Sequence, residues 1–145
     1  MKNILLLFLF FAFAPVVIAD ECQKCFESIN NYRTQSQCPK LIWSDEIAAD
    51  CQQWADKLQS IGAIRYRGRL FRKGGGIHGY SGENCACGNE SGYETFRQWL
   101  TSEAGHREFM ERQDTMVGAV AKSGLYWVFR AEKSIETYKS KTKKQ

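Results

Sequence analysis

Two short segments of the chain carry the side chains that could do chemistry. Glu83 stands in Gly-Glu-Asn at 82–84, and His106 follows Gly105 further along the chain. We expect both on loops that flank an apolar helix, because loops on a rigid frame concentrate binding and catalytic residues. A carboxylate beside an imidazole can fix the ring tautomer and raise its basicity, which suits general-base catalysis or metal binding.

Each of these residues also has a structural interpretation. A histidine at a helix terminus can bond the backbone, and a carboxylate in a turn can accept local amide hydrogens. For hydrolysis, the candidate nucleophiles are Ser81 and Ser102 with His106 as the base, and neither serine stands in a nucleophile elbow. We therefore assign no catalytic residue from the sequence.

Metal binding is the minor alternative to a site without a cofactor. A catalytic zinc ion ordinarily takes three protein ligands, and the chain has only two histidines, His78 and His106. These two are the residues that would bind zinc.

Residues 1–19 have the pattern of a secretory signal peptide. Lys2 precedes an apolar run from Ile4 to Ala14, and the small-residue pattern Val17-Ile18-Ala19 predicts cleavage before Asp20. The apolar run is shorter than the roughly twenty residues of a membrane span, which disfavours a retained anchor. We expect a secreted protein with no transmembrane span after cleavage.

Residues 20–145 suffice for one domain. The formal net charge is +4, and many of the lysines lie in a tail at 132–145. A short lysine-rich tail is typical of a solvated terminus, and nucleic-acid binding requires a basic face with groove-reading or stacking elements. We therefore expect no nucleic-acid partner.

All six cysteines follow the predicted cleavage point. They are Cys22, Cys25, Cys38, Cys51, Cys85 and Cys87. An even number in an exported chain predicts three disulfides of undetermined pairing, with a redox or metal pair at 22–25 as the alternative. In a eukaryotic host, Asn89 would also be an acceptor for N-glycosylation and the product a glycoprotein.

Hydrophobic spacing predicts three main helices. The first spans Cys25 to Gln37, the second begins after a Ser44 cap and ends at Gly62, and the third begins with a capping box of Ser91 and Glu94. The apolar residues that we expect the third helix to bury are Tyr93, Phe96, Trp99 and Leu100. A further helical turn is expected at 107–113.

Strands are predicted mainly at the end of the chain. Met116 to Ala121 and Leu125 to Ala131 form a hairpin around a turn at 122–124, and 63–80 is an edge strand or irregular arm. Helices first and a hairpin last predict an α+β fold, a small antiparallel sheet covered by helices.

The order of several motifs resembles the CAP domain, found in cysteine-rich secretory proteins, antigen 5 and plant pathogenesis-related 1 proteins. The motifs are Leu41-Ile42-Trp43, Ala48-Ala49, Trp54-Ala55, Gly82-Glu83-Asn84, Phe96-Arg97-Gln98-Trp99-Leu100, Gly105-His106-Arg107, Val117-Gly118-Ala119-Val120-Ala121 and Tyr126-Trp127. The resemblance assigns 20–131 as a CAP (SCP) domain. Its compact Trp-x-x-Ser-x-x-Gly-His-Arg segment is similar to the bacterial and fungal branch.

The resemblance implies an α-β-α sandwich with a shallow cleft lined by two histidines and two glutamates. Glu83 and His106 match two of them. Ser102 stands where the second glutamate is usual, with Glu103 beside it, and His78 is the nearest histidine to the remaining position.

The resemblance also implies a function. We rank a non-catalytic secreted protein first, with a lipid or sterol, or a host, prey or microbial protein receptor, as its partner. The alternative is a secreted hydrolase or protease that depends on Glu and His, with or without a metal.

Overall fold

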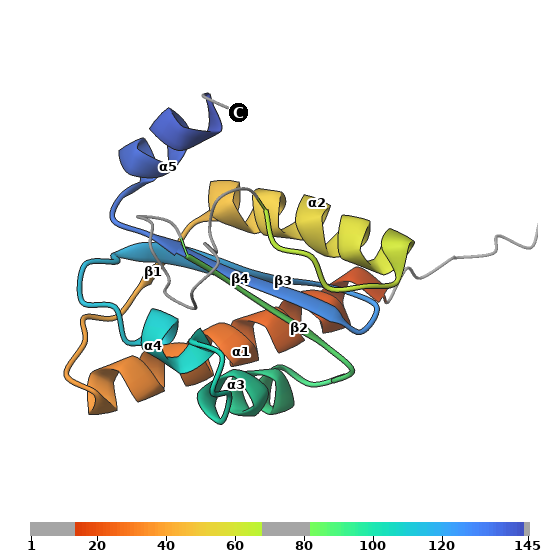
Figure 1. The fold of residues 1–145 in the computed structure, drawn as a ribbon, viewed down its shortest axis with the longest axis horizontal. Helices are drawn as coiled ribbons and strands as arrows, with labels where there is room; N and C mark the ends of the chain where they lie inside the picture. The colour runs from red at the N-terminus through yellow and green to blue at the C-terminus, as the bar shows by residue number, and fades with distance from the viewer. Residues whose placement is uncertain (1–13, 68–81, 144–145) are drawn as a thin grey trace, which may run out of the picture.

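The computed structural model describes residues 14–67 and 82–143. Its elements, in chain order, are α1 (Ala14–Gln35), β1 (Ile42–Trp43), α2 (Asp45–Ile61), β2 (Gly82–Cys87), α3 (Gly92–Leu100), α4 (His106–Met110), β3 (Val117–Ser123), β4 (Tyr126–Glu132) and α5 (Ile135–Thr142). Figure 1 shows α2 above the sheet and α1, α3 and α4 below it. This confirms an α+β fold built as an α-β-α sandwich.

The four strands lie in the order β1-β3-β4-β2. The predicted hairpin is confirmed, because β3 and β4 pair antiparallel around Gly124, whose φ is 54°. β2 pairs antiparallel with β4 on the other side, and the two-residue β1 pairs parallel with β3. The sheet is therefore mixed rather than purely antiparallel.

Each face of the sheet buries its own hydrophobic core. The core below the sheet contains Phe26 and Ile29 of α1 with Trp99 of α3. The core above contains Ile47 and Leu58 of α2. Because side chains alternate along a strand, Asn84 and Ala86 face downwards, whereas Glu83 and Cys85 face α2.

The predicted helix caps are confirmed. The Ser44 hydroxyl accepts from the Ile47 N–H, and Gly62 ends α2 at a φ of 64°, in the left-handed region that glycine favours. The Ser91 hydroxyl accepts from the Glu94 N–H at the start of α3. The expected burial along α3 is wrong for Tyr93, which is 56% exposed.

One prediction about the middle of the chain needs correction. Gly82–Cys87 is a strand rather than a loop, so Glu83 projects from the sheet. A Cβ at Gly82 would lie 1.8 Å from Phe109 of α4, and this close approach explains the glycine. Of the two alternatives predicted for 63–80, residues 63–67 form the irregular arm and not the edge strand, and 68–81, which include Ser81, lie outside the described residues.

The ends of the chain also differ from expectation. α1, described over Ala14–Gln35, extends upstream of the predicted start at Cys25, and cleavage before Asp20 stays a prediction. Ile135–Thr142 is a helix that buries Tyr138, so this part of the lysine-rich tail is not a solvated terminus. None of the helices among the described residues is long and apolar enough to cross a membrane.

All six cysteines are free thiols in the structure, and the three disulfides stay a prediction. Cys51 does point into the core, as its place in the apolar stripe predicts, and Cys85 shares that core. Burial raises the pKa of Cys22 to about 12 and also raises the pKa of Cys25, Cys51 and Cys85. These four thiols are therefore poor nucleophiles at neutral pH.

Candidate functional site

Glu83 lies on β2 with its carboxylate fully buried beneath Arg67. The Arg67 guanidinium donates to Glu83 Oε1 from Nε at 2.8 Å and from Nη2 at 2.5 Å, and the Arg67 backbone N–H reaches Oε2 at 3.3 Å. The Glu83 side chain is 0% exposed, and Arg67 also stacks over the Trp54 ring at 5.2 Å. The carboxylate is therefore neutralised and shielded from solvent.

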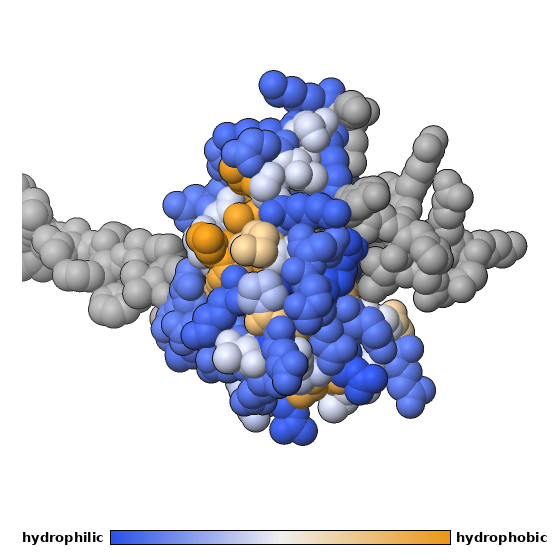
Figure 2. Space-filling view, turned by 90° about the vertical axis from the view of Figure 1, so that its left-hand side faces the viewer, coloured by the Kyte–Doolittle hydropathy of each residue, from blue (hydrophilic) through white to orange (hydrophobic). Residues whose placement is uncertain are grey.

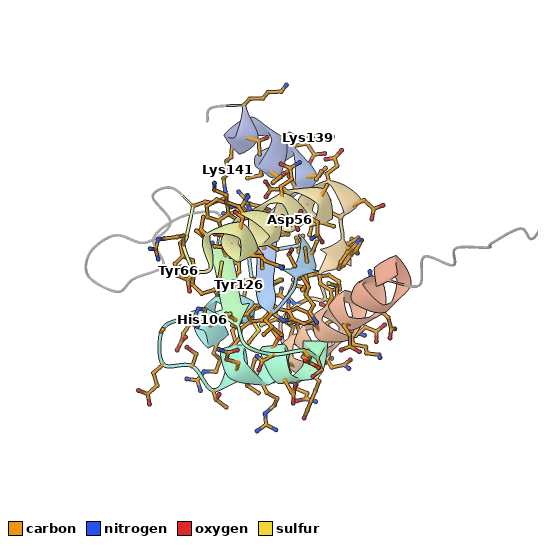
Figure 3. All side chains as sticks on the ribbon, turned by 90° about the vertical axis from the view of Figure 1, so that its right-hand side faces the viewer. Asp56, Tyr66, His106, Tyr126, Lys139 and Lys141 are labelled. Atoms are coloured by element: carbon orange, nitrogen blue, oxygen red, sulfur yellow. The ribbon has the colours of Figure 1, made fainter. Side chains whose placement is uncertain are left out.

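His106 begins α4 and has hydrogen-bond partners on both ring nitrogens. The Ser102 hydroxyl lies 2.7 Å from Nδ1, and the Tyr66 hydroxyl lies 3.0 Å from Nε2. Asn84 Nδ2 donates to the His106 carbonyl at 3.0 Å, which ties α4 to β2. Figure 3 shows Tyr66 and His106 on the same side of the molecule, beside β2.

The ionisation of this cluster follows from its burial. Burial lowers the pKa of His106, although the nearby Glu108 acts in the opposite direction. Burial also raises the pKa of Tyr66 to about 12. At neutral pH the ring and the phenol are both uncharged, so one ring nitrogen donates and the other accepts.

Glu83 and His106 belong to one cluster but form no direct hydrogen bond. The consecutive residues Tyr66 and Arg67 contact His106 and Glu83 respectively, and Asn84 contacts the His106 backbone. Sequence reasoning missed Tyr66 and Arg67, although they lie in the cationic and aromatic segment that was taken for an edge strand or arm.

Of the other predicted site residues that the structure describes, Ser102 alone joins this cluster. Ser102 contacts His106, whereas Glu103 next to it is exposed on the turn before α4. His78 lies outside the described residues. Asn89 lies between β2 and α3, where its Nδ2 donates to Gln98 at 2.5 Å, and its glycosylation stays a prediction.

Zinc does not fit the side chains that the structure describes. Both ring nitrogens of His106 have hydroxyl partners, and the Glu83 carboxylate is bound by Arg67. Across 14–67 and 82–143, no group of three or more His, Cys, Asp or Glu side chains could hold a metal ion. A zinc site that uses His78 stays untested.

A chain of ion pairs connects Glu83 to the C-terminal helix. Asp50 of α2 binds Arg67 and Arg130, each at 2.8 Å. Arg130 lies 3.5 Å from Glu132, which in turn binds Lys141 of α5 at 2.8 Å. Positive and negative charges alternate along this chain, which allows several buried charges to be neutralised together.

Two grooves lie beside the helices. One, of about 380 Å³, separates α1 from α3 and is lined by Ser28, Asn31, Tyr32, Gln35, Tyr93, Phe96, Arg97, Leu100 and Thr101. The other, of about 460 Å³, lies between α1, α2 and β3. On the face seen in Figure 2, apolar residues form only a small patch among hydrophilic ones. The grooves are therefore better candidates for ligand binding than that face.

The fold is similar to those of three bacterial structures. An extracellular protein containing an SCP domain from Bacillus anthracis superposes with a TM-score of 0.69 at 18% identity, over 80% of this chain and 41% of that one. A cysteine-rich secretory protein from Staphylococcus aureus superposes with a TM-score of 0.57 at 11% identity, over 80% of this chain and 39% of that one. An outer surface protein from Borrelia burgdorferi superposes with a TM-score of 0.61 at 19% identity, over 79% of this chain and 94% of that one.

These similarities establish the fold alone. The chain spans less than half the length of the first two proteins. No curated protein matches the chain in sequence. Residues 26–133 match the CAP family, described as the cysteine-rich secretory protein family, and because this match covers most of the chain, the chain belongs to that family.

Proposed function

We propose that this chain is an extracellular, non-catalytic CAP protein that binds a lipid, either a sterol or a fatty acid, between α1 and α3. The aromatic lining of the α1–α3 groove carries this proposal. The centre of the Phe96 ring lies 6.0 Å from that of Tyr32 and 6.3 Å from that of Tyr93, so the groove is lined by three neighbouring aromatic rings with Phe96 in the middle.

The groove has the size and the polarity that a lipid requires. Its volume of about 380 Å³ lies in the range typical of small-molecule sites. Tyr93 is largely exposed, and a ligand that fills the groove would remove the apolar surface of its ring from water. Arg97 and Gln35 at its rim are exposed, and they could bind a carboxylate or a sterol hydroxyl.

The state of Glu83 supports a non-catalytic role. A general base needs a free carboxylate near the proton it removes, whereas this one is bound by Arg67 and shielded from solvent. The alternative of a Glu- and His-dependent hydrolase has less support. Among the described residues, Ser102 contacts His106, but the other ring nitrogen is bound by the Tyr66 hydroxyl and not by a carboxylate.

Extracellular location is part of the proposal. It is supported by the signal-peptide pattern of 1–19 and by the extracellular and outer-surface proteins that share the fold. A secreted chain meets lipids as free monomers or at membrane surfaces, where a groove with aromatic walls and a polar rim can hold them.

The test combines lipid extraction with thermal melting. Mass spectrometry of an organic extract of the purified protein should show retained lipid, and sodium oleate or cholesterol sulfate should raise the melting temperature, because a ligand bound only to the folded state stabilises it. A clean extract together with unchanged melting for both ligands would reject the proposal.

A matched pair of variants locates the site. Ser28 lines the groove and Thr34 does not, although both hydroxyls bond the carbonyl four residues earlier in α1. Ser28→Arg should abolish the melting shift, whereas Thr34→Arg should retain it. Equal shifts in both variants would show that the lipid binds elsewhere.

A further inference from the structure

The outer edge of β3 is only partly covered by another strand. β1 pairs with β3 at Val117 and Gly118 alone, and then the chain turns into α2 at Ser44. The remaining length of β3, from Ala119 to Ser123, lies beyond β1 and between α1 and α2. Among the described residues, this length is paired with no strand on that side, although Ala119 to Ala121 are buried.

Successive residues of a strand direct their N–H and C=O groups to opposite sides, and this alternation determines which backbone groups of β3 point outwards. The Ser44 N–H donates to the Gly118 carbonyl, and Gln52 Nε2 donates to the Lys122 carbonyl at 2.9 Å. Val120 lies midway between these two, so its N–H and C=O point the same way. Among the described residues, no hydrogen bond from β1, α1 or α2 reaches them.

An unpaired peptide group at this position is costly. Val120 is 2% exposed, and shielded backbone groups in folded proteins are almost always hydrogen-bonded. Gln52 shows that α2 supplies a partner to the edge at Lys122, yet no side chain among the described residues does the same for Val120. Within the part of the chain that the structure describes, the Val120 N–H and C=O therefore have no hydrogen-bond partner on this side of β3.

A groove of about 460 Å³ leads to these groups. Its walls are formed by Cys22 of α1 on one side and by Trp43, Ala48 and Gln52 on the other, and Ala121 forms part of its floor. Ala48 and Ala121 are small, which leaves room for side chains of an incoming segment. The groove thus runs along the end of β3 and its turn, from Val120 to Gly124.

The lining of this groove includes one carboxylate, that of Asp56, and one ammonium, that of Lys122. Asp56, labelled on α2 in Figure 3, accepts only from the neutral amide of Gln52 and has no ion-pair partner among the described residues. The Lys122 ammonium is engaged elsewhere, because it bonds the Glu90 carbonyl at 2.6 Å and lies 4.9 Å from the Trp127 ring. A cationic side chain in the groove would therefore face an unpaired carboxylate.

We propose that this groove binds an extended peptide segment of another protein, which adds a strand to β3 and places a lysine or arginine against Asp56. Main-chain groups of the segment supply the acceptor and donor that Val120 lacks, and its small apolar side chains contact Ala48 and Ala121. A lipid tail would bury the same groups without bonding them. This site is separate from the α1–α3 groove.

The test uses the full chain and a set of acetylated, amidated hexapeptides that alternate Val and Thr, with one Lys at each position in turn. Titration followed by NMR should shift the amide signals of Val120 and Lys122 for at least one peptide. In that peptide, N-methylation of the amides that face β3 should weaken binding at least about tenfold, the loss expected from one or two hydrogen bonds. N-methylation of an outward amide should change affinity much less.

Two variants of α2 provide the matched comparison. Ala48→Arg should block the groove and abolish binding, whereas Gln53→Arg adds the same charge at an exposed position that does not line it and should leave affinity unchanged. Asp56→Asn should weaken the binding of the peptides that carry lysine and leave the affinity of a neutral peptide unchanged. The proposal is overturned if no peptide shifts the β3 amides, or if N-methylated and unmodified peptides bind alike. The N-methylation series needs no variant, so the test stands even if Ala48→Arg fails to fold.

Discussion

Arg67 closes over the carboxylate of Glu83, with Nε and Nη2 both directed at Oε1 at 2.8 and 2.5 Å. Glu83, the acidic residue of the Gly-Glu-Asn motif, therefore anchors the segment that follows α2. The same guanidinium reaches Asp50 at 2.8 Å, so it joins β2, α2 and this segment in one contact. The arrangement explains how an acid can lie fully buried beside a sheet, because its charge is paired with that of Arg67.

Loss of Arg67 should destabilise the fold. Arg67→Ala leaves Glu83 as a buried carboxylate without its cation, and breaking such a pair costs about 3 kcal/mol or more. Urea unfolding followed by circular dichroism measures the change. Arg65→Ala, an exposed neighbour on the same segment, is the control and should cost less than about 0.5 kcal/mol. Similar unfolding midpoints for both variants would contradict the anchoring role.

Gly82→Ala should also destabilise the protein, because the added methyl group would overlap the Phe109 ring. Gly82 lacks a positive φ, so alanine would otherwise suit this strand, and the expected cost of about 1–3 kcal/mol comes from overpacking. Combining it with Phe109→Leu tests the cause, since the smaller side chain should recover part of the loss. A double variant whose two effects simply add would argue against the contact.

Local signals predicted the ends of α2 and the start of α3 well, and the site less well. The caps at Ser44, Gly62 and Ser91 depend on neighbours within four residues, so the sequence pattern was sufficient. Gly82–Cys87 was taken for a loop because its strand character comes from pairing with β4, 39 to 49 residues further along the chain.

The partners in the site are also distant in the chain. Tyr66 contacts His106 across 40 residues, and Arg67 contacts Glu83 across 16. No periodicity within the segment indicates which of its several arginines turns inwards. The helix at the C-terminus was missed for a related reason, because Tyr138 is its one buried side chain and its docking depends on Arg130 and Glu132 of β4.

The docking of this helix gives a third prediction. Tyr138 is the buried side chain of α5, and the Arg130 guanidinium lies 5.2 Å from the centre of its ring. Tyr138→Ala should lower the free energy of unfolding by about 2–3 kcal/mol, because it removes apolar burial and the cation–π contact. Lys139→Ala removes an exposed ion pair with Glu46 and should change stability by less than about 1 kcal/mol. Differential scanning calorimetry compares the two, and equal melting temperatures would indicate that α5 contributes little to the fold.

His106 should make stability depend on pH in a defined direction. Burial holds its folded pKa below the ordinary value of 6.5, so the unfolded chain binds a proton more readily than the folded one. The free energy of unfolding should therefore fall as the pH drops below 6.5 and level off below the folded pKa, while above 6.5 His106 contributes no slope. Urea unfolding between pH 5 and 7.5 measures this slope, which His106→Gln should reduce.

NMR can test the cause of that slope directly. The ring signals of His106, identified by their loss in His106→Gln, should titrate below pH 6.5, because protonation would place a charge in a site whose partners are the neutral hydroxyls of Tyr66 and Ser102. Either hydroxyl can accept from the protonated ring, but neither carries the negative charge that would favour it. A titration at or above 6.5 would mean that a carboxylate, and not burial, dominates the environment of His106, and the site would then have to be reconsidered as an acid–base pair.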